Sequence, residues 1–160
     1  MAARVIDVKP HHFVDIIAGY GVGQVASEPN DYHNDVPGVT AAVLGDPGVM
    51  LRIESGADDI CKPCVHNVNG SCDDTLGPSD GPQAPKLKRE LNLLLDQRWC
   101  ERLGLTQGDQ LTARELSERI RASKGDIRDI YRELPPRYGD EKARALDLGL
   151  ARYRSVPKLI

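Results

Sequence analysis

Residues 86–104 read KLKRELNLLLDQRWCERLG, and this stretch predicts a fold built mainly from α-helices. Its large apolar side chains recur at intervals of three and four residues, which places them on one face of an α-helix. They form a single drifting stripe of Leu87, Leu91, Leu94, Leu95, Trp99 and Leu103. Gly104 follows directly and predicts the helix end, because glycine readily adopts the left-handed conformation common there.

The chain beyond this helix predicts three more helices. Thr112 and Glu115 stand in capping-box spacing, so we expect one helix to begin there and to end near Gly125. A short helix is expected over 127–134, where the prolines at 135 and 136 would stop it. Asp140 is placed to cap a last helix. The apolar positions of these last two helices are Ile127, Ile130, Tyr131 and Leu134, then Ala143, Leu146, Leu150 and Tyr153.

The N-terminal part of the chain predicts two strands and two helices. Residues 5–8 are apolar enough for a short strand, and Pro10 suits the first turn of the helix that follows. That helix should stop within the glycine run at 19–23, and residues 24–38 should be mainly loop. We expect a short helix at 39–44 and, from its alternating apolar pattern, a strand at 49–54.

Composition limits the fold class. The chain has 160 residues, 40% hydrophobic and 28% charged, which suits one globular domain. We therefore predict an α+β fold that is mostly helical, with a small strand component and a metal-organised loop packed on a helical core. Residues 1–160 would form a single metal-binding domain, in which 56–85 carries most ligands and 106–160 is a helical C-terminal extension.

Residues 56–85 have almost no apolar periodicity, although they hold three of the four cysteines. A loop of this length inside a compact domain needs something to organise it. Cys61 and Cys64 form a C-x2-C pair, a spacing that lets two thiolates turn onto one metal, and Cys72 follows. The tight turn expected at Asn69-Gly70 would swing Cys72 back toward the pair. We therefore predict a metal centre here.

Cys100, in the helix of residues 86–104, is the candidate fourth ligand. It lies about 60° from Leu103 on a helical wheel, at the edge of the apolar stripe. Cys61, Cys64, Cys72 and Cys100 would then all bind the metal centre. A clustered set with one distant last cysteine favours a 4Fe–4S cluster. Zinc is the alternative, held by the four thiolates or by Cys61, Cys64, His66 and Cys72.

The aspartates on both sides of the cysteines argue against a free nucleophilic thiolate. Asp58-Asp59 precede Cys61, and Asp73-Asp74 follow Cys72. A nearby carboxylate raises the pKa of a thiol, because it disfavours a second negative charge. For each aspartate taken singly, a solvated loop charge is an equally good interpretation.

The adjacent histidines at the expected helix start are candidate catalytic residues. His11 or His12 could act as a general acid or base, or as a ligand. The simpler interpretation is one packed and one surface histidine. Arg98 lies near the apolar stripe and could pair with a carboxylate, although a long side chain reaching out to solvent is the simpler interpretation.

Charge and hydropathy limit the partners. The formal net charge of −3 argues against a general nucleic-acid binder. The apolar run at the N-terminus is interrupted by Asp7 and Lys9, so we predict neither a secretion signal nor a membrane span. We expect the cytoplasm, where thiols stay reduced and bind metals. A redox partner protein or a small-molecule substrate would fit such a centre.

Three segments together resemble a small bacterial and archaeal family of unassigned function whose members are sometimes labelled iron–sulfur binding. They are KPHH near the N-terminus, GADDICKPCVHN in the middle and the late WCERLGL. The resemblance covers most of residues 6–105 and implies a metal centre without implying a reaction. It is carried by Pro10, His11, His12, Asp58, Asp59, Cys61, Cys64, His66 and Cys72.

Three functions stay open at this point. The first is an iron–sulfur protein with four cysteine ligands that serves electron transfer or redox sensing. The second is a 4Fe–4S enzyme of the hydratase or desulfidase kind, with three cysteine ligands, an open iron, a free Cys100, and His11 or His12 as acid or base. The third is a structural zinc domain that serves as an interaction module.

Overall fold

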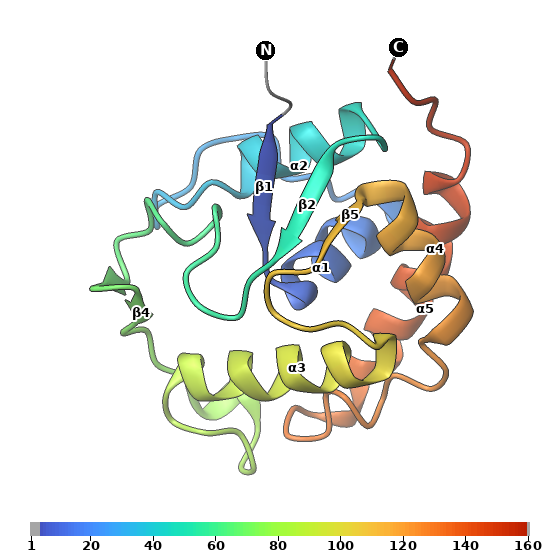
Figure 1. The fold of residues 1–160 in the computed structure, drawn as a ribbon. Helices are drawn as coiled ribbons and strands as arrows, with labels where there is room; N and C mark the ends of the chain where they lie inside the picture. The colour runs from blue at the N-terminus through green and yellow to red at the C-terminus, as the bar shows by residue number, and fades with distance from the viewer. Residues whose placement is uncertain (1–3, 160) are drawn as a thin grey trace.

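The computed structural model describes residues 4–159 and confirms the mostly helical α+β fold. Over these residues two small sheets accompany five α-helices. The helices are α1 (Pro10–Gly21), α2 (Val36–Gly45), α3 (Lys88–Leu103), α4 (Ala113–Ser123) and α5 (Pro136–Tyr153). Figure 1 shows α1 behind the central sheet, α3 along its lower edge, and α4 and α5 together on one side.

The central sheet has the strand order β1-β2-β5. Strand β1 (Val5–Val8) runs parallel to β2 (Met50–Ile53), and β5 (Gln110–Thr112) pairs antiparallel with β2. The parallel pair needs a long crossover, which α1 and α2 provide. Strand β5 is the one strand of this sheet that the sequence did not predict, because three residues are too few to show an alternating pattern.

Helix ends follow the expected capping chemistry. Gly104 ends α3 with a φ of 66°, the left-handed conformation predicted for it. The hydroxyl of Thr112 accepts a hydrogen bond of 3.1 Å from the backbone N–H of Glu115, which starts α4 where predicted. Helix α2 starts three residues before the predicted position, because the side chain of Asp35 accepts from the N–H of Gly38.

Two predictions on the C-terminal part of the chain are wrong. Residues 128–133 form consecutive turns rather than a helix, although Ile127, Ile130 and Tyr131 are buried as a helical stripe would be. Helix α5 begins at Pro136, so Asp140 lies inside it and does not cap it. Proline fits the first turn of a helix without losing a hydrogen bond, and the helix therefore begins earlier than the aspartate suggested.

The segment between β2 and α3 is a long connection with a small hairpin. Strands β3 (Asn67–Val68) and β4 (Ser71–Cys72) pair antiparallel, and a 3-10 turn follows at Pro78–Asp80. The hairpin lies at the edge of the molecule opposite to α4 and α5 (Figure 1). The rest of this segment is irregular, as the sequence predicted.

The C-terminal helices share one apolar core with the rest of the chain. Trp99 of α3 donates a hydrogen bond to the hydroxyl of Tyr131, and Tyr153 of α5 donates one of 2.6 Å to the carbonyl of Val43. Arg98 forms a two-pronged ion pair with Glu133, so it pairs with a carboxylate rather than simply reaching solvent. Over residues 4–159, no helix is both long and apolar enough to cross a membrane.

Helices α1 and α5 approach each other so closely that their backbones touch. A Cβ atom at Gly149 would overlap the carbonyl oxygen of Ile17, and one at Gly21 would overlap the backbone of Gly149. Glycine is therefore required at this crossing for space rather than for backbone freedom. Since α1 also carries His11 and His12, the crossing helps to fix the position of both histidines.

We predict that Gly149→Ala lowers the free energy of unfolding by about 1–3 kcal/mol, because the two backbones must separate to admit one methyl group. Urea denaturation checks this. Gly45→Ala is the matched control, since Gly45 also lies in a helix and a Cβ there meets no atom within 4 Å. Equal stability of the two variants would contradict the close crossing.

Candidate metal centre and the adjoining histidines

Three of the four cysteines line one small cavity of about 30 Å³, here called the cysteine cavity. The residues around it come from the end of β1, the C-x2-C turn and the β3–β4 hairpin. They are Lys9, Ala57, Cys61, Cys64, His66, Asn67, Gly70 and Cys72. Three sulfur-bearing side chains and one imidazole thus face the same small space.

Local backbone hydrogen bonds place the three cysteines. The N–H of Cys64 donates to the carbonyl of Cys61 at 2.9 Å, which closes a turn and puts both side chains on one side. The hairpin then pairs Asn67 with Cys72 and so returns the chain to this turn. Asn69 and Gly70 have φ angles of 53° and 85°, the left-handed pair that a tight hairpin turn needs. The predicted reversal at Asn69-Gly70 is confirmed.

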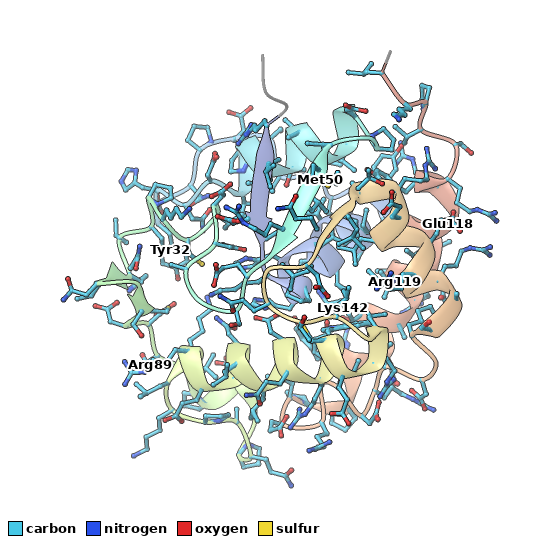
Figure 2. All side chains as sticks on the ribbon, viewed as in Figure 1. Tyr32, Met50, Arg89, Glu118, Arg119 and Lys142 are labelled. Atoms are coloured by element: carbon cyan, nitrogen blue, oxygen red, sulfur yellow. The ribbon has the colours of Figure 1, made fainter. Side chains whose placement is uncertain are left out.

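His66 is held by an aspartate of its own hairpin. Its Nδ1 lies 2.8 Å from a carboxylate oxygen of Asp73, and its ring packs against the edge of Tyr32. Figure 2 shows Tyr32 on the same side of the molecule as the hairpin. The contact with Asp73 occupies Nδ1. Nε2 lies 3.9 Å from a carboxylate oxygen of Asp74, beyond hydrogen-bond distance, and is the nitrogen that can bind a ligand.

Lys9 and Asp58 surround the thiol of Cys61 with opposite charges. The ammonium of Lys9 lies 3.5 Å from the sulfur, and the backbone N–H of Cys61 donates to Asp58 at 3.0 Å. Burial and, after it, the charge of Asp58 raise the pKa of the Cys61 thiol to about 11. Cys61 is therefore a protonated thiol at neutral pH unless a metal binds it, which agrees with the prediction against a free nucleophile.

Asp58 is completely buried and is the centre of the hydrogen bonding around this site. One carboxylate oxygen accepts from the backbone N–H of Lys9 and contacts Nδ1 of His12, both at 2.7 Å. The other accepts from Cys61. Burial alone would raise the pKa of Asp58, but these hydrogen bonds and His12 hold it below its usual value. Of the two interpretations of the flanking aspartates, solvated loop charge does not apply to Asp58.

One potential ligand atom each from His12, Asp58 and Cys61 lies within 4.8 Å of the other two, so this group also has the chemistry to hold a metal. Its carboxylate oxygens, however, already accept three hydrogen bonds from the protein. The cysteine cavity offers more thiols, and Cys61 belongs to both sets. No three ligand atoms of Cys61, Cys64, His66 and Cys72 all lie within 4.8 Å of one another, however, so these side chains would have to draw together around an ion.

The two adjacent histidines make different contacts. Consecutive residues on a helix point about 100° apart, so they face different neighbours. His11 is buried, and both its ring Nδ1 and its backbone N–H contact one carboxylate oxygen of Asp96 in α3. Burial is the largest single effect on the pKa of His11 and lowers it, but the charge and the hydrogen bond of Asp96 together outweigh burial and raise the pKa overall. Burial and the neighbouring His11 lower the pKa of His12.

Cys100 does not line the cysteine cavity. It stands in the last turn of α3 and packs against the apolar core. The N-terminal end of α3 lies below the hairpin, whereas its C-terminal end lies on the far side (Figure 1). Burial, with Asp96 nearby, raises the pKa of Cys100 to about 11.

Sequence reasoning missed Lys9 and Asp96. Asp96 stands three residues before Trp99 and seven before Leu103, so it falls on the apolar stripe of α3. A single acid on such a stripe indicates a buried partner, and this signal was available in the sequence. Nothing in the sequence indicated that Lys9 contacts Cys61, because 52 residues separate them.

Comparison of the chain with protein-family models, curated proteins and solved structures finds no match. The family resemblance described above therefore stays a prediction.

The pair of His11 and Asp96 predicts a pH-dependent stability. Because the pKa of folded His11 is raised, the charged pair stabilises the fold fully below about pH 6.5 and ceases to do so as the pH rises through the folded pKa. We expect Asp96→Asn to lower the free energy of unfolding by about 1–3 kcal/mol at pH 5.5 and by less at pH 8.5.

Urea denaturation of the wild type and of Asp96→Asn at both pH values measures this difference. Asp31→Asn is the control, since Asp31 is exposed and no ion pair of residues 4–159 includes it. A loss of stability that grows with pH would contradict the assignment of the charged state to His11.

Proposed function

We propose that this protein binds a single metal ion, zinc, through Cys61, Cys64, Cys72 and Nε2 of His66. The observation that supports this most directly is that these four side chains line the same cavity. Three thiolates and one imidazole are a common donor set for structural zinc, and the C-x2-C spacing is typical of it.

The volume of the cysteine cavity favours one ion. At about 30 Å³ it is several times smaller than the cavity of about 150 Å³ that holds benzene. Three thiolates around Zn²⁺ leave one net negative charge, and the ammonium of Lys9 near Cys61 would offset it. The same ammonium has no evident role beside a protonated thiol.

The contact between His66 and Asp73 supports the assignment of His66. A histidine that binds a metal through one nitrogen commonly gives its other N–H to a carboxylate, which fixes the tautomer and the ring orientation. Asp73 at 2.8 Å from Nδ1 is placed for this task. Asp73 would thus act on the metal through His66 and not as a ligand itself.

The proposed ion would organise the long irregular segment. Within 56–85 the two strands have two residues each, which is too little pairing for independent stability. An ion held by the C-x2-C turn and by both sides of the hairpin would join these pieces to each other. The function would then be that of a metal-stabilised domain with an exposed hairpin at its edge.

An iron–sulfur cluster on Cys61, Cys64 and Cys72 is the second candidate. The position of the His12–Asp58 pair beside Cys61 favours it, because an acid–base group next to an open iron would suit a lyase-type enzyme. A 4Fe–4S cluster is much larger than a single ion, however, so the cysteine cavity would have to widen to hold it. The four-cysteine form would need Cys100, which packs on the core at the far end of α3.

Metal analysis of protein purified without oxygen tests both candidates. We expect about one zinc per chain and no visible colour.

Asp73→Asn should weaken zinc affinity about 10–100-fold, because His66 loses its orienting partner. Cys72→Ser should weaken it more, and Cys100→Ser, the matched control, should leave it unchanged. Iron together with a broad absorption near 400 nm would instead identify an iron–sulfur cluster. Loss of that iron in Cys100→Ser would identify Cys100 as the fourth ligand.

Removal of the metal should loosen the hairpin. We expect a strong chelator to expose residues 62–75 to limited proteolysis, because the ion that joins the turn to the hairpin is gone. Wild-type protein with and without chelator is compared by the sites of cleavage. Cys72→Ser should be cleaved there even without chelator, whereas identical cleavage in all samples would show that the ion does not organise this segment.

A further inference from the structure

A second cavity, of about 200 Å³, is lined by His12 and by none of the cysteines, and is here called the His12 cavity. Its walls come from α1, α2, the loop between them and Ile60, which directly precedes Cys61. Most of them are apolar: Ile16, Val25, Ala26, Val36 and Ile60. Its polar lining residues are His12, Asp15, Gln24 and Thr40. A small, mostly apolar space with a few polar groups is the usual form of a small-molecule site.

His12 has one ring nitrogen available to such a ligand. Its Nδ1 is engaged by the buried Asp58 at 2.7 Å, which fixes the ring and favours a proton on Nδ1. Over residues 4–159 no protein group makes a hydrogen bond with Nε2. In this tautomer Nε2 carries a lone pair, so His12 offers the cavity a hydrogen-bond acceptor that a buried carboxylate holds in place.

Thr40 contributes a second unsatisfied group. It is only 3% exposed, and its hydroxyl is buried without a hydrogen-bond partner within the described part of the chain. Leaving a buried hydroxyl unpaired costs about 1–3 kcal/mol. Valine would fill the same volume without that cost. The hydroxyl is covered in this structure, so a ligand in the cavity would reach it after rotation of the Thr40 side chain.

The charges around the cavity indicate a neutral ligand. Asp15 is the one acid among its lining residues, and Lys142 pairs with it at 2.7 Å. No lysine or arginine lines the His12 cavity, so nothing there attracts an anion. Asp15 and Gln24 also line a wider groove of about 630 Å³ between α1 and α5, which gives the cavity a route to solvent.

We propose that the His12 cavity binds a small neutral molecule with an apolar body and one hydroxyl group. The hydroxyl donates to Nε2 of His12 and accepts from the hydroxyl of Thr40. A cavity of about 150 Å³ is known to hold benzene, so one of about 200 Å³ suits a six-membered ring that carries a hydroxyl. The ligand class is therefore a small alcohol or phenol. This site does not depend on which metal the cysteines bind.

Phenol is the probe, and benzene is the matched control that lacks the hydroxyl. Each is titrated into the protein as purified, while the ¹⁵N shift of Nε2 of His12 is followed by NMR. Phenol should bind at least fivefold more tightly than benzene and shift the Nε2 signal, because a site that hydrogen-bonds a hydroxyl rejects the analogue without one. Thr40→Val should lower the affinity for phenol at least fivefold and leave the affinity for benzene unchanged.

Ala26→Phe should abolish binding of both probes, because Ala26 lines the cavity, whereas Ala41→Phe should not, because Ala41 is equally exposed but does not line it. The proposal fails if neither probe binds the wild type, or if phenol binds no better than benzene and Thr40→Val has no effect. Thr40 and Ala26 do not line the cysteine cavity. Metal content measured on the same samples therefore separates a failure of the metal centre from a failure of this site.

Discussion

The carboxylate of Asp58 joins three parts of the chain that are far apart in sequence. It receives the backbone N–H of Lys9 at the end of β1, the ring of His12 in α1, and the N–H of Cys61 in the cysteine turn. A fully buried carboxylate is tolerated only when hydrogen bonds replace its lost water, and here the backbone and His12 supply them. Loss of any one of these partners would leave a buried charge short of hydrogen bonds, so the start of α1 and the cysteine turn are positioned together.

Helix α1 transmits this arrangement to the rest of the molecule. Its first turn carries His12 against Asp58, and its glycine-rich end is in backbone contact with α5 at Gly149. Because packed helices resist sliding, the position of the first turn follows from the crossing at the other end. The C-terminal helices, which the sequence suggested as an extension, therefore contribute to the placement of the site although they supply none of its cysteines.

His12 stands between two spaces of different chemistry. Asp58 connects it to Cys61 of the thiol-lined cavity, and its side chain also lines a mostly apolar cavity. The two adjacent histidines therefore differ in their contacts. Nδ1 of His11 contacts Asp96 in the core, whereas Nδ1 of His12 contacts Asp58, and Nε2 of His12 has no hydrogen bond within residues 4–159. A metal that stabilises Cys61 would also hold Asp58, and with it the orientation of His12. The two proposed sites would then share a structural support without sharing a ligand.

Local chemistry in the sequence determined the fold class, most helices, the glycine stop after Leu103 and the turn at Asn69-Gly70, because each depends on neighbours a few residues apart. The C-x2-C pair with Cys72 likewise indicated where a metal would bind. The sequence could not decide whether Cys100 joins them, since that depends on which way α3 packs across the molecule. Nor could it show that Asp58 is buried, because burial is created by segments about fifty residues apart in the chain. Only the tertiary structure brought these groups together, and it placed Cys100 outside the lining of the cavity that the other three cysteines share.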